Sequence, residues 1–136
     1  EQEKQPHMLE LASSYVERLT GERYTLDILG INKGVALINN NGERLELKFW
    51  SSGLADQVYL ALRLALAKVF SYQVESLPII LDDILVRFDE NRQRSALELL
   101  AELGKNQQIW LFTCQRSVYD MAQSIMGIDC HRLSRS

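Results

Sequence analysis

The chain has 136 residues, a length that fits one domain, and its 46% hydrophobic and 24% charged content is typical of globular protein. A formal net charge of -3 argues against a nucleic-acid binder that works by bulk positive charge, although it is compatible with a local basic patch. No apolar run reaches the roughly 18 residues of a membrane span, and the polar first residues are unlike a secretory signal. We therefore expect a cytoplasmic protein without a membrane partner. Because the first residue is Glu1 and not Met, we also expect a piece of a longer chain.

The two cysteines, Cys114 and Cys130, lie sixteen positions apart, and nothing near them has the spacing of metal ligands. Cys114 follows the apolar run 109–112, which predicts a buried thiol in a reducing compartment and no disulfide. His131 follows Cys130 directly. Adjacent side chains on a strand point to opposite faces, so we interpret this pair as structural.

The first third of the chain predicts a helix followed by a small antiparallel sheet. Apolar residues recur at helical spacing over 3–20, and Gly21 stands where such a helix would end. Three short runs rich in strand formers follow, with an Asn-Gly turn before the last of them, at 24–29, 35–39 and 43–48. This part therefore divides into a helical segment at 1–21 and a β unit at 22–49.

Helices and apolar strands alternate over residues 50–136. The run 54–70 is apolar on nearly every side, which predicts a buried helix. The run 77–81 lacks alternation, as expected for a parallel strand covered on both faces. Two more helices and two more strands are expected, the helices at 89–103 and 118–126 and the strands at 108–113 and 129–133. This order predicts an α/β fold with parallel core strands and flanking helices, joined to the N-terminal segments in one domain over 1–136.

The segment Trp50–Gly53 precedes the apolar helix and has the composition of an anion site. A helix N-terminus leaves amides unsatisfied and carries partial positive charge. The hydroxyls of Ser51 and Ser52 add donors, and Gly53 lets a phosphate approach the backbone. The plainer interpretation is a serine N-cap, which the same residues would provide.

Two carboxylates, Asp82 and Asp83, end the apolar run 77–81. Carboxylates at the end of a buried strand are costly unless they bind something, and ligands of open α/β sheets collect at the carboxyl ends of strands. One aspartate can hold Mg²⁺, and its neighbour can orient an attacking water. The structural alternative is helix capping or pairing with a basic residue, for which Arg87 and Arg63 are candidates.

Two further segments carry weaker signals. Val86–Asp89 forms a turn just past the carboxylates, with Asp89 placed to cap the next helix. Thr113–Gln115 follows the second apolar strand. If the two strands are parallel neighbours, these polar side chains reach the same ligand as Asp82 and Asp83.

Taken in order, the four segments resemble the motifs of SMC/RecF/SbcC-like ABC-type ATPase heads. The resemblance is to the signature loop, Walker B, the D-loop and the strand before the switch residue, at WSSGL (50–54), LPIILDD (77–83), VRFDENR (86–92) and IWLFTCQ (109–115). The likeness is strongest to the bacterial YhaN-like group, through YVERLTGERY, SSGLADQVYLALRLALA and ILDDILVRFDENR. It extends over nearly the whole chain.

The resemblance implies the C-terminal half of such a head and a role for each motif residue. Ser51, Ser52 and Gly53 would bind the γ-phosphate of ATP held by a second head. Asp82 would hold Mg²⁺, and Asp83 would act as the general base. Asp89 would be the D-loop aspartate, and Gln115 would be the switch residue. Residues 1–21 would form the root of a coiled-coil arm.

Three departures from the family pattern bear on activity. Asp83 stands where most ABC ATPases have Glu, and Gln115 stands where the family usually has His. Glutamine can hydrogen-bond a phosphate but cannot carry positive charge, which puts fast hydrolysis in doubt. Ser52 and Leu54 replace Gly and Gln of the usual signature loop.

No G-x-x-x-x-G-K-[ST] phosphate loop occurs in the sequence. In the family this loop lies in an N-terminal lobe, so the resemblance implies that lobe as a partner, without which the chain alone is inactive. ATP and Mg²⁺ would bind only with that lobe. A second head and DNA are further expected partners, and a nuclease subunit would fit an SbcC-like protein. The expected biological setting is DNA repair or chromosome maintenance.

Two other functions stay open. Gln115 in place of His is compatible with a nucleotide-gated switch that binds ATP without hydrolysing it. A free-standing interaction module with degenerate ABC motifs is the third hypothesis.

Overall fold

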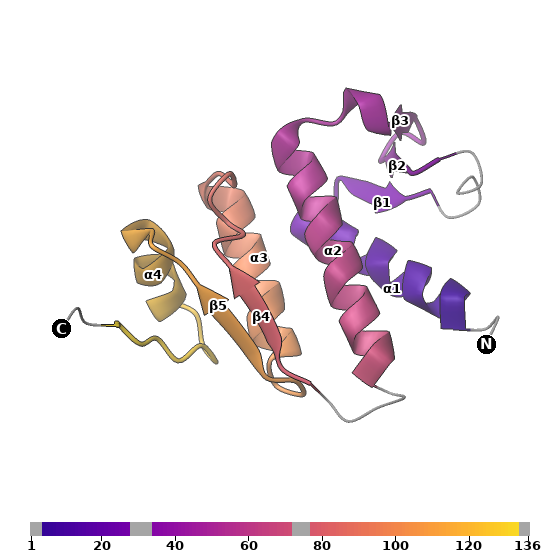
Figure 1. The fold of residues 1–136 in the computed structure, drawn as a ribbon. Helices are drawn as coiled ribbons and strands as arrows, with labels where there is room; N and C mark the ends of the chain where they lie inside the picture. Colours follow the sequence, from indigo (N-terminus) through magenta and orange to yellow (C-terminus); the bar gives the residue numbers. More distant parts are fainter. Residues whose placement is uncertain (1–3, 28–33, 72–76, 134–136) are drawn as a thin grey trace. The chain divides into compact units, whose positions relative to one another are not determined.

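The computed structural model describes residues 4–27, 34–71 and 77–133, drawn in colour in Figure 1. The chain forms two compact units, Glu1–Leu77 and Pro78–Ser136. The helix expected at 54–70 therefore belongs to the first unit, and not to the unit of the parallel strands that follow it. No helix within the described ranges is long and apolar enough to cross a membrane.

Two helices form the core of the first unit. The helix α1 (Lys4–Leu19) confirms the periodic segment at its expected place and packs against α2 (Ser52–Ser71). Apolar side chains at helical spacing meet between them, because residues three and four apart lie on the same helix face. The buried ones include Ala12, Tyr15, Val16 and Leu19 of α1 and Val58, Ala61, Leu64 and Ala65 of α2.

The same unit holds a three-stranded antiparallel sheet in the order β1 (Tyr24–Leu26), β2 (Ala36–Asn39), β3 (Arg44–Glu46). The expected Asn-Gly turn joins β2 to β3. Its geometry comes from Gly42 at φ +81° and from the Asn39 side-chain oxygen, which accepts from two backbone N–H groups of the turn. The last strand is shorter than predicted, since a 3-10 helix replaces its final residues. Part of the predicted first strand, 28–29, lies outside the described residues.

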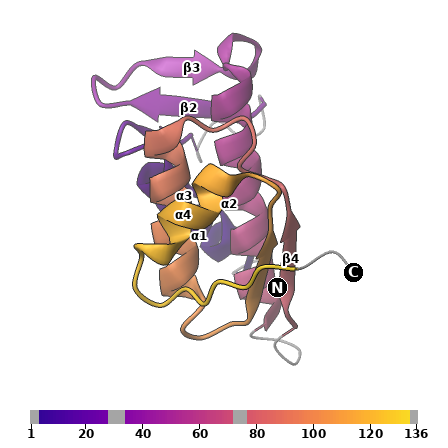
Figure 2. The ribbon, with the colours of Figure 1, turned by 90° about the vertical axis from the view of Figure 1, so that its left-hand side faces the viewer.

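The second unit is built on two parallel strands joined by a helix. Strand β4 (Ile79–Asp82) pairs with β5 (Ile109–Phe112), and the connection between them contains α3 (Glu90–Leu103). A further helix, α4 (Arg116–Gln123), follows β5 and contacts α3, as Figure 2 shows. The predicted α/β class is confirmed, and the parallel register places the ends of both strands together, Asp82 opposite Phe112.

One face of the parallel strands is exposed, which corrects the expectation of a strand covered on both faces. Ile80, Trp110 and Phe112 keep 59%, 46% and 43% of their surface accessible, whereas Leu81 is fully buried. The Trp110 and Phe112 rings lie on the same face, stacked with centroids 6.5 Å apart. The unbroken apolar run 77–81 has the composition of a strand covered on both faces. Within the described residues, however, only one face of β4 is covered.

Four smaller expectations also fail. The helix α2 is not buried all round, because Tyr59, Leu66 and Phe70 are exposed. Residues 129–133 form no strand, and the last helix begins and ends earlier than predicted. Cys114 is exposed rather than buried, because it lies beyond the end of β5, where the chain has left the sheet.

Candidate functional site at the ends of the parallel strands

The carboxyl end of β4 presents the two predicted carboxylates in different ways. Asp82 is the last residue of the strand and is exposed. Asp83 is the first residue past the strand, and its N–H donates to the Phe112 carbonyl at 2.7 Å. The Asp83 backbone has φ +55°, in the left-handed region that non-glycine residues rarely adopt. The chain therefore turns sharply at Asp83 while one hydrogen bond still holds it to β5.

Side chains that follow β5 surround the Asp83 carboxylate. The Thr113 hydroxyl lies 3.5 Å from one carboxylate oxygen, and the Cys114 sulfur lies 3.6 Å from the other. The hydroxyl of Thr113 in turn accepts from the backbone N–H of Gln115 at 3.0 Å. Two residues of the predicted segment Thr113–Gln115 thus meet the Asp83 carboxylate, whereas Gln115 bonds to Thr113 through its backbone N–H.

Gln115 occupies the N-cap position of α4 but makes no side-chain capping bond. Its Oε1 is buried and has no hydrogen-bond partner within the described parts of the chain. A buried carbonyl oxygen without a partner is uncommon and calls for an explanation. A ligand that brings a donor to this oxygen would provide one.

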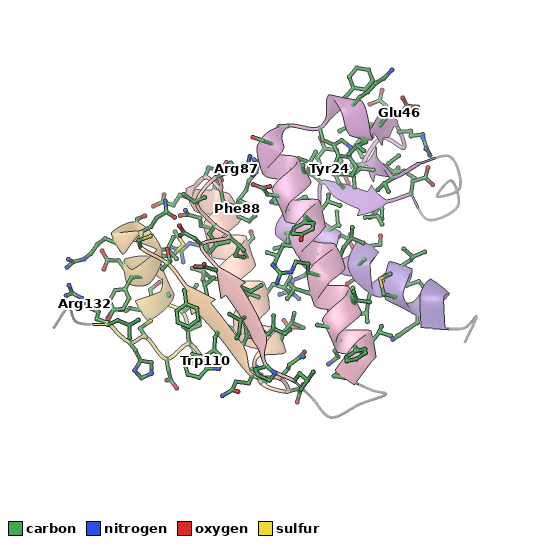
Figure 3. The ribbon with its side chains drawn as sticks, viewed as in Figure 1. Tyr24, Glu46, Arg87, Phe88, Trp110 and Arg132 are labelled. Carbon is green, nitrogen blue, oxygen red and sulfur yellow. The ribbon has the colours of Figure 1, made fainter. Side chains whose placement is uncertain are left out.

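The turn between β4 and α3 carries the predicted D-loop segment, with Arg87 and Phe88 labelled in Figure 3. Asp89 is the N-cap of α3, and its side chain accepts from the Arg92 N–H at 2.8 Å. The capping interpretation of Asp89 is therefore satisfied in the structure. The turn is anchored from inside by Gln93, only 6% exposed, whose Nε2 donates to the Leu85 carbonyl at 3.1 Å.

The signature-like segment lies at the N-terminus of α2, in the first unit. The Ser51 hydroxyl oxygen accepts from the Leu54 N–H at 3.1 Å, so Ser51 caps the helix. Ser51 and Ser52 are exposed, and Gly53 is buried in the first turn. The capping bond uses a lone pair of Ser51, which leaves its hydroxyl hydrogen available to an anion.

Gln57 was not singled out in the sequence. It is fully buried, and its Nε2 donates to the carbonyl of Leu19, the last residue of α1. Its Oε1 has no partner within the described parts of the chain. The signal was a polar residue inside an apolar helix, which usually means a specific hydrogen bond. Gln57 thus ties the end of α1 to the helix that begins at the signature-like segment.

A hollow of about 850 Å³ lies beside β5 in the second unit, bounded by α3, α4 and residues 127–133. Leu100, Trp110 and Val118 are among the side chains that line it. Among the described strands, β5 pairs only with β4, so its second edge has no hydrogen-bonded neighbour. Cys130 also borders the hollow, where burial and then the neighbouring Asp129 charge raise the pKa of its thiol.

No family model matches the chain. Over 122 residues it is 34% identical to YhaN, an uncharacterised protein of Bacillus subtilis strain 168, which aligns with 88% of this chain and 12% of YhaN. The SMC head domain from Thermotoga maritima superposes with a TM-score of 0.67 and 20% identity, over 85% of this chain and 40% of that one. An SMC structure described for ATP-driven dimerisation and DNA-stimulated activation gives a TM-score of 0.69 and 16% identity, over 86% and 73% of the two chains.

These likenesses define the class of the protein: the chain has the fold of part of an SMC-type ATPase head. In sequence it is a homologue of YhaN, and it spans about an eighth of that protein's length, 12%. The resemblance seen in the motifs is therefore confirmed for the fold and for the YhaN relationship.

Proposed function

We propose that this chain is the C-terminal lobe of an SMC/SbcC-like ATPase head in which ATP is bound between two heads and hydrolysed. The observation that carries the proposal is the meeting of Asp83 with Thr113 at the carboxyl ends of β4 and β5. Ligands of open α/β sheets bind at this edge, and Asp83 and Gln115 are the residues that the ATPase resemblance assigns to chemistry.

In this proposal Asp83 accepts a proton from a water whose oxygen attacks the γ-phosphorus. The bond to the bridging oxygen then breaks, and ADP leaves. Asp82 would hold Mg²⁺, which when bound neutralises charge on the phosphates. No three His, Cys, Asp or Glu side chains gather as a metal site among the described residues. One carboxylate with phosphate and water oxygens fits the usual ligands of Mg²⁺.

Ser51, Ser52 and Gly53 would serve the site of the opposite head. The exposed hydroxyls at the N-terminus of α2 support this role, because they add donors to the positive end of the helix. Asp89 would communicate across the head dimer from its place as the cap of α3. The dimerisation named for one SMC relative supports the second head as a partner.

The N-terminal lobe is the other proposed partner, since it would bring the phosphate loop that this sequence lacks. The open edge of β5 and the adjoining hollow support a docking place for it, because an unpaired strand edge can accept a further strand. DNA is proposed from the DNA-stimulated SMC relative, and a nuclease subunit only from the SbcC likeness. The proposed setting is DNA repair or chromosome maintenance in the cytoplasm.

The full-length protein with Asp83→Asn tests this function. We expect turnover to fall at least about 100-fold, the low end of what a general base contributes, while ATP binding persists. Size-exclusion chromatography with ATP and Mg²⁺ should show a trapped head dimer. Glu98→Gln, which makes the same carboxylate-to-amide change at an exposed position of α3 in the same unit, is the matched control and should behave as the parent. Parent-like turnover by Asp83→Asn would exclude Asp83 as the base.

A second function, a nucleotide-gated switch with little hydrolysis, is favoured by one observation. Gln115 lacks the positive charge of His, and its buried Oε1 has no partner within the described parts of the chain. If this function holds, Gln115→His in the full-length protein should raise kcat about tenfold, since removing one transition-state donor costs at least that much. An unchanged kcat in Gln115→His would contradict the switch function.

A further inference from the structure

We infer that Thr113 and Cys114 are positioning residues that hold the Asp83 carboxylate by both its oxygens and link it to Gln115. The inference rests on the proposed function, which makes Asp83 the general base. It adds two residues to which no role has been assigned so far, one of them an exposed cysteine.

The need for such a hold follows from the backbone at Asp83. Its N–H is fixed to the Phe112 carbonyl at 2.7 Å, and its φ of +55° turns the chain out of the strand. These restraints fix the Cα position but leave the carboxylate free to rotate about the side-chain bonds. A general base must be aimed at the proton it takes, so something beyond the backbone has to set its orientation.

The two donors are arranged to set that orientation. An ionised carboxylate only accepts hydrogen bonds, so the hydroxyl and the thiol must be the donors. Thr113 Oγ1 lies 3.5 Å from Asp83 Oδ1, and Cys114 Sγ lies 3.6 Å from Oδ2. At these lengths each contact is weak, but one on each oxygen restrains the plane of the carboxylate. A carboxylate has about four lone-pair sites, so an attacking water can still bind.

Thr113 also connects the base to the switch residue. Its oxygen accepts from the Gln115 N–H at 3.0 Å, which leaves its own hydrogen to point to Asp83. A shift of Gln115 toward a bound phosphate would pull on Thr113 and through it on the carboxylate. The side chains that follow β5 thus join phosphate sensing to the base at the end of β4.

Thr113 could instead serve only structure, because a hydroxyl that accepts an N–H two residues later is a common local turn. The two roles differ in what they depend on. A structural role acts whether or not Asp83 has a carboxylate, whereas a positioning role has no effect once that carboxylate is gone. A double-mutant cycle with Asp83 separates them.

The experiment measures kcat and KM for ATP in the full-length protein. We expect Thr113→Val to lower kcat about tenfold with KM within about twofold, because only orientation for the chemical step is lost. Thr113→Ser keeps the hydroxyl and should restore kcat to within about twofold. Cys114→Ala should lower kcat about threefold, and Cys114→Ser should restore it.

The same substitutions are then made with Asp83→Asn. If the inference is right, Thr113→Val causes no further loss there. A tenfold additional loss, or parent-like kcat for Thr113→Val, would overturn the inference and leave the proposed function intact. Full turnover by Asp83→Asn would overturn both. If Thr113→Val fails to fold, the exposed Cys114 pair makes the same test in the same two backgrounds.

Discussion

The two regions to which the proposed function assigns the ATP-site motifs are built in different ways. At the N-terminus of α2, Ser51 and its capping partner Leu54 are three residues apart, so the site is made by one stretch of chain. At the end of β4, the contacts of Asp83 come from residues thirty and thirty-one positions later. A helix-terminal site needs only local sequence, whereas the carboxylate site exists only once β4 and β5 pair in the right register.

The largest expected effect comes from mixing variants of the two regions. Ser51→Arg should remove the signature function, and Asp83→Asn should remove the base, so each full-length variant alone should be nearly inactive. If the motifs act across a head dimer, a mixed dimer has one intact site. Random pairing of equal amounts should then restore about a quarter of the parent turnover, from half the dimers with one site of two. The measurement is steady-state ATP hydrolysis of the mixture.

The control for mixing is a variant that carries both substitutions in one chain. Added to either single variant, it gives no dimer with an intact site and should restore nothing. If both motifs acted within the same head, the two single variants would not complement each other.

A smaller effect concerns the buried amide that joins α1 to α2. At neutral pH, Gln57→Glu should destabilise the chain by at least about 2 kcal/mol, because a buried carboxylate must be desolvated or protonated. Gln57→Leu should cost less, about 1 kcal/mol, since it loses the bond to Leu19 but also removes an Oε1 that has no partner among the described residues. Thermal melting of both variants gives the order. A larger loss for Gln57→Leu would contradict this order and would mean that the buried position accommodates a carboxyl group better than an apolar side chain.

The two capping residues allow a matched comparison of the two regions. Ser51→Ala and Asp89→Ala each remove one side-chain bond to a helix N-terminus. Each should lower the free energy of unfolding by about 1 kcal/mol. Ser52→Ala, with an exposed side chain in the first turn of α2, is the control and should cost less. Urea denaturation measures all three, and a loss near zero for Asp89→Ala would mean that its cap adds nothing to stability.

The smallest expected difference is in thiol reactivity. Cys114 is exposed, whereas Cys130 is half-buried and its pKa is raised by burial and by Asp129. A raised pKa means less thiolate at a given pH, so iodoacetamide should modify Cys114 before Cys130 near pH 8. Labelling of Cys130 should accelerate as the pH rises through its raised pKa. Mass spectrometry of partly labelled protein gives the order, and faster labelling of Cys130 would contradict it.

Local features of the sequence predicted the local structure well. Periodicity located α1, apolar runs located both parallel strands, and the capping roles of Ser51 and Asp89 followed from residue type alone. Composition could not tell which strand faces are covered, since Ile80 and Leu81 are both apolar yet only one is buried. Whether a side chain is buried depends on which other segments of the chain pack against it. An apolar residue type permits burial but does not determine it.

The contacts of the candidate site were only partly predictable. The sequence indicated that Thr113–Gln115 should approach the carboxylates, but it gave no reason to choose Asp83 over Asp82 as the one contacted. Asp83 is the one contacted because the chain turns sharply there. No neighbouring glycine in the sequence indicated this backbone conformation. Gln57 was missed because it bonds a carbonyl distant in sequence, and Gln93 because its partner Leu85 lies in the turn before its own helix.

Because of the left-handed backbone at Asp83, selection for stability and selection for activity should favour different residues at this position. Glycine adopts this conformation without steric penalty, and aspartate tolerates it better than the longer glutamate. A library screened for heat resistance alone should therefore enrich Asp83→Gly, which relieves up to about 1 kcal/mol of strain. The same library screened for ATP turnover should discard it, so position 83 would separate thermostable variants from active ones.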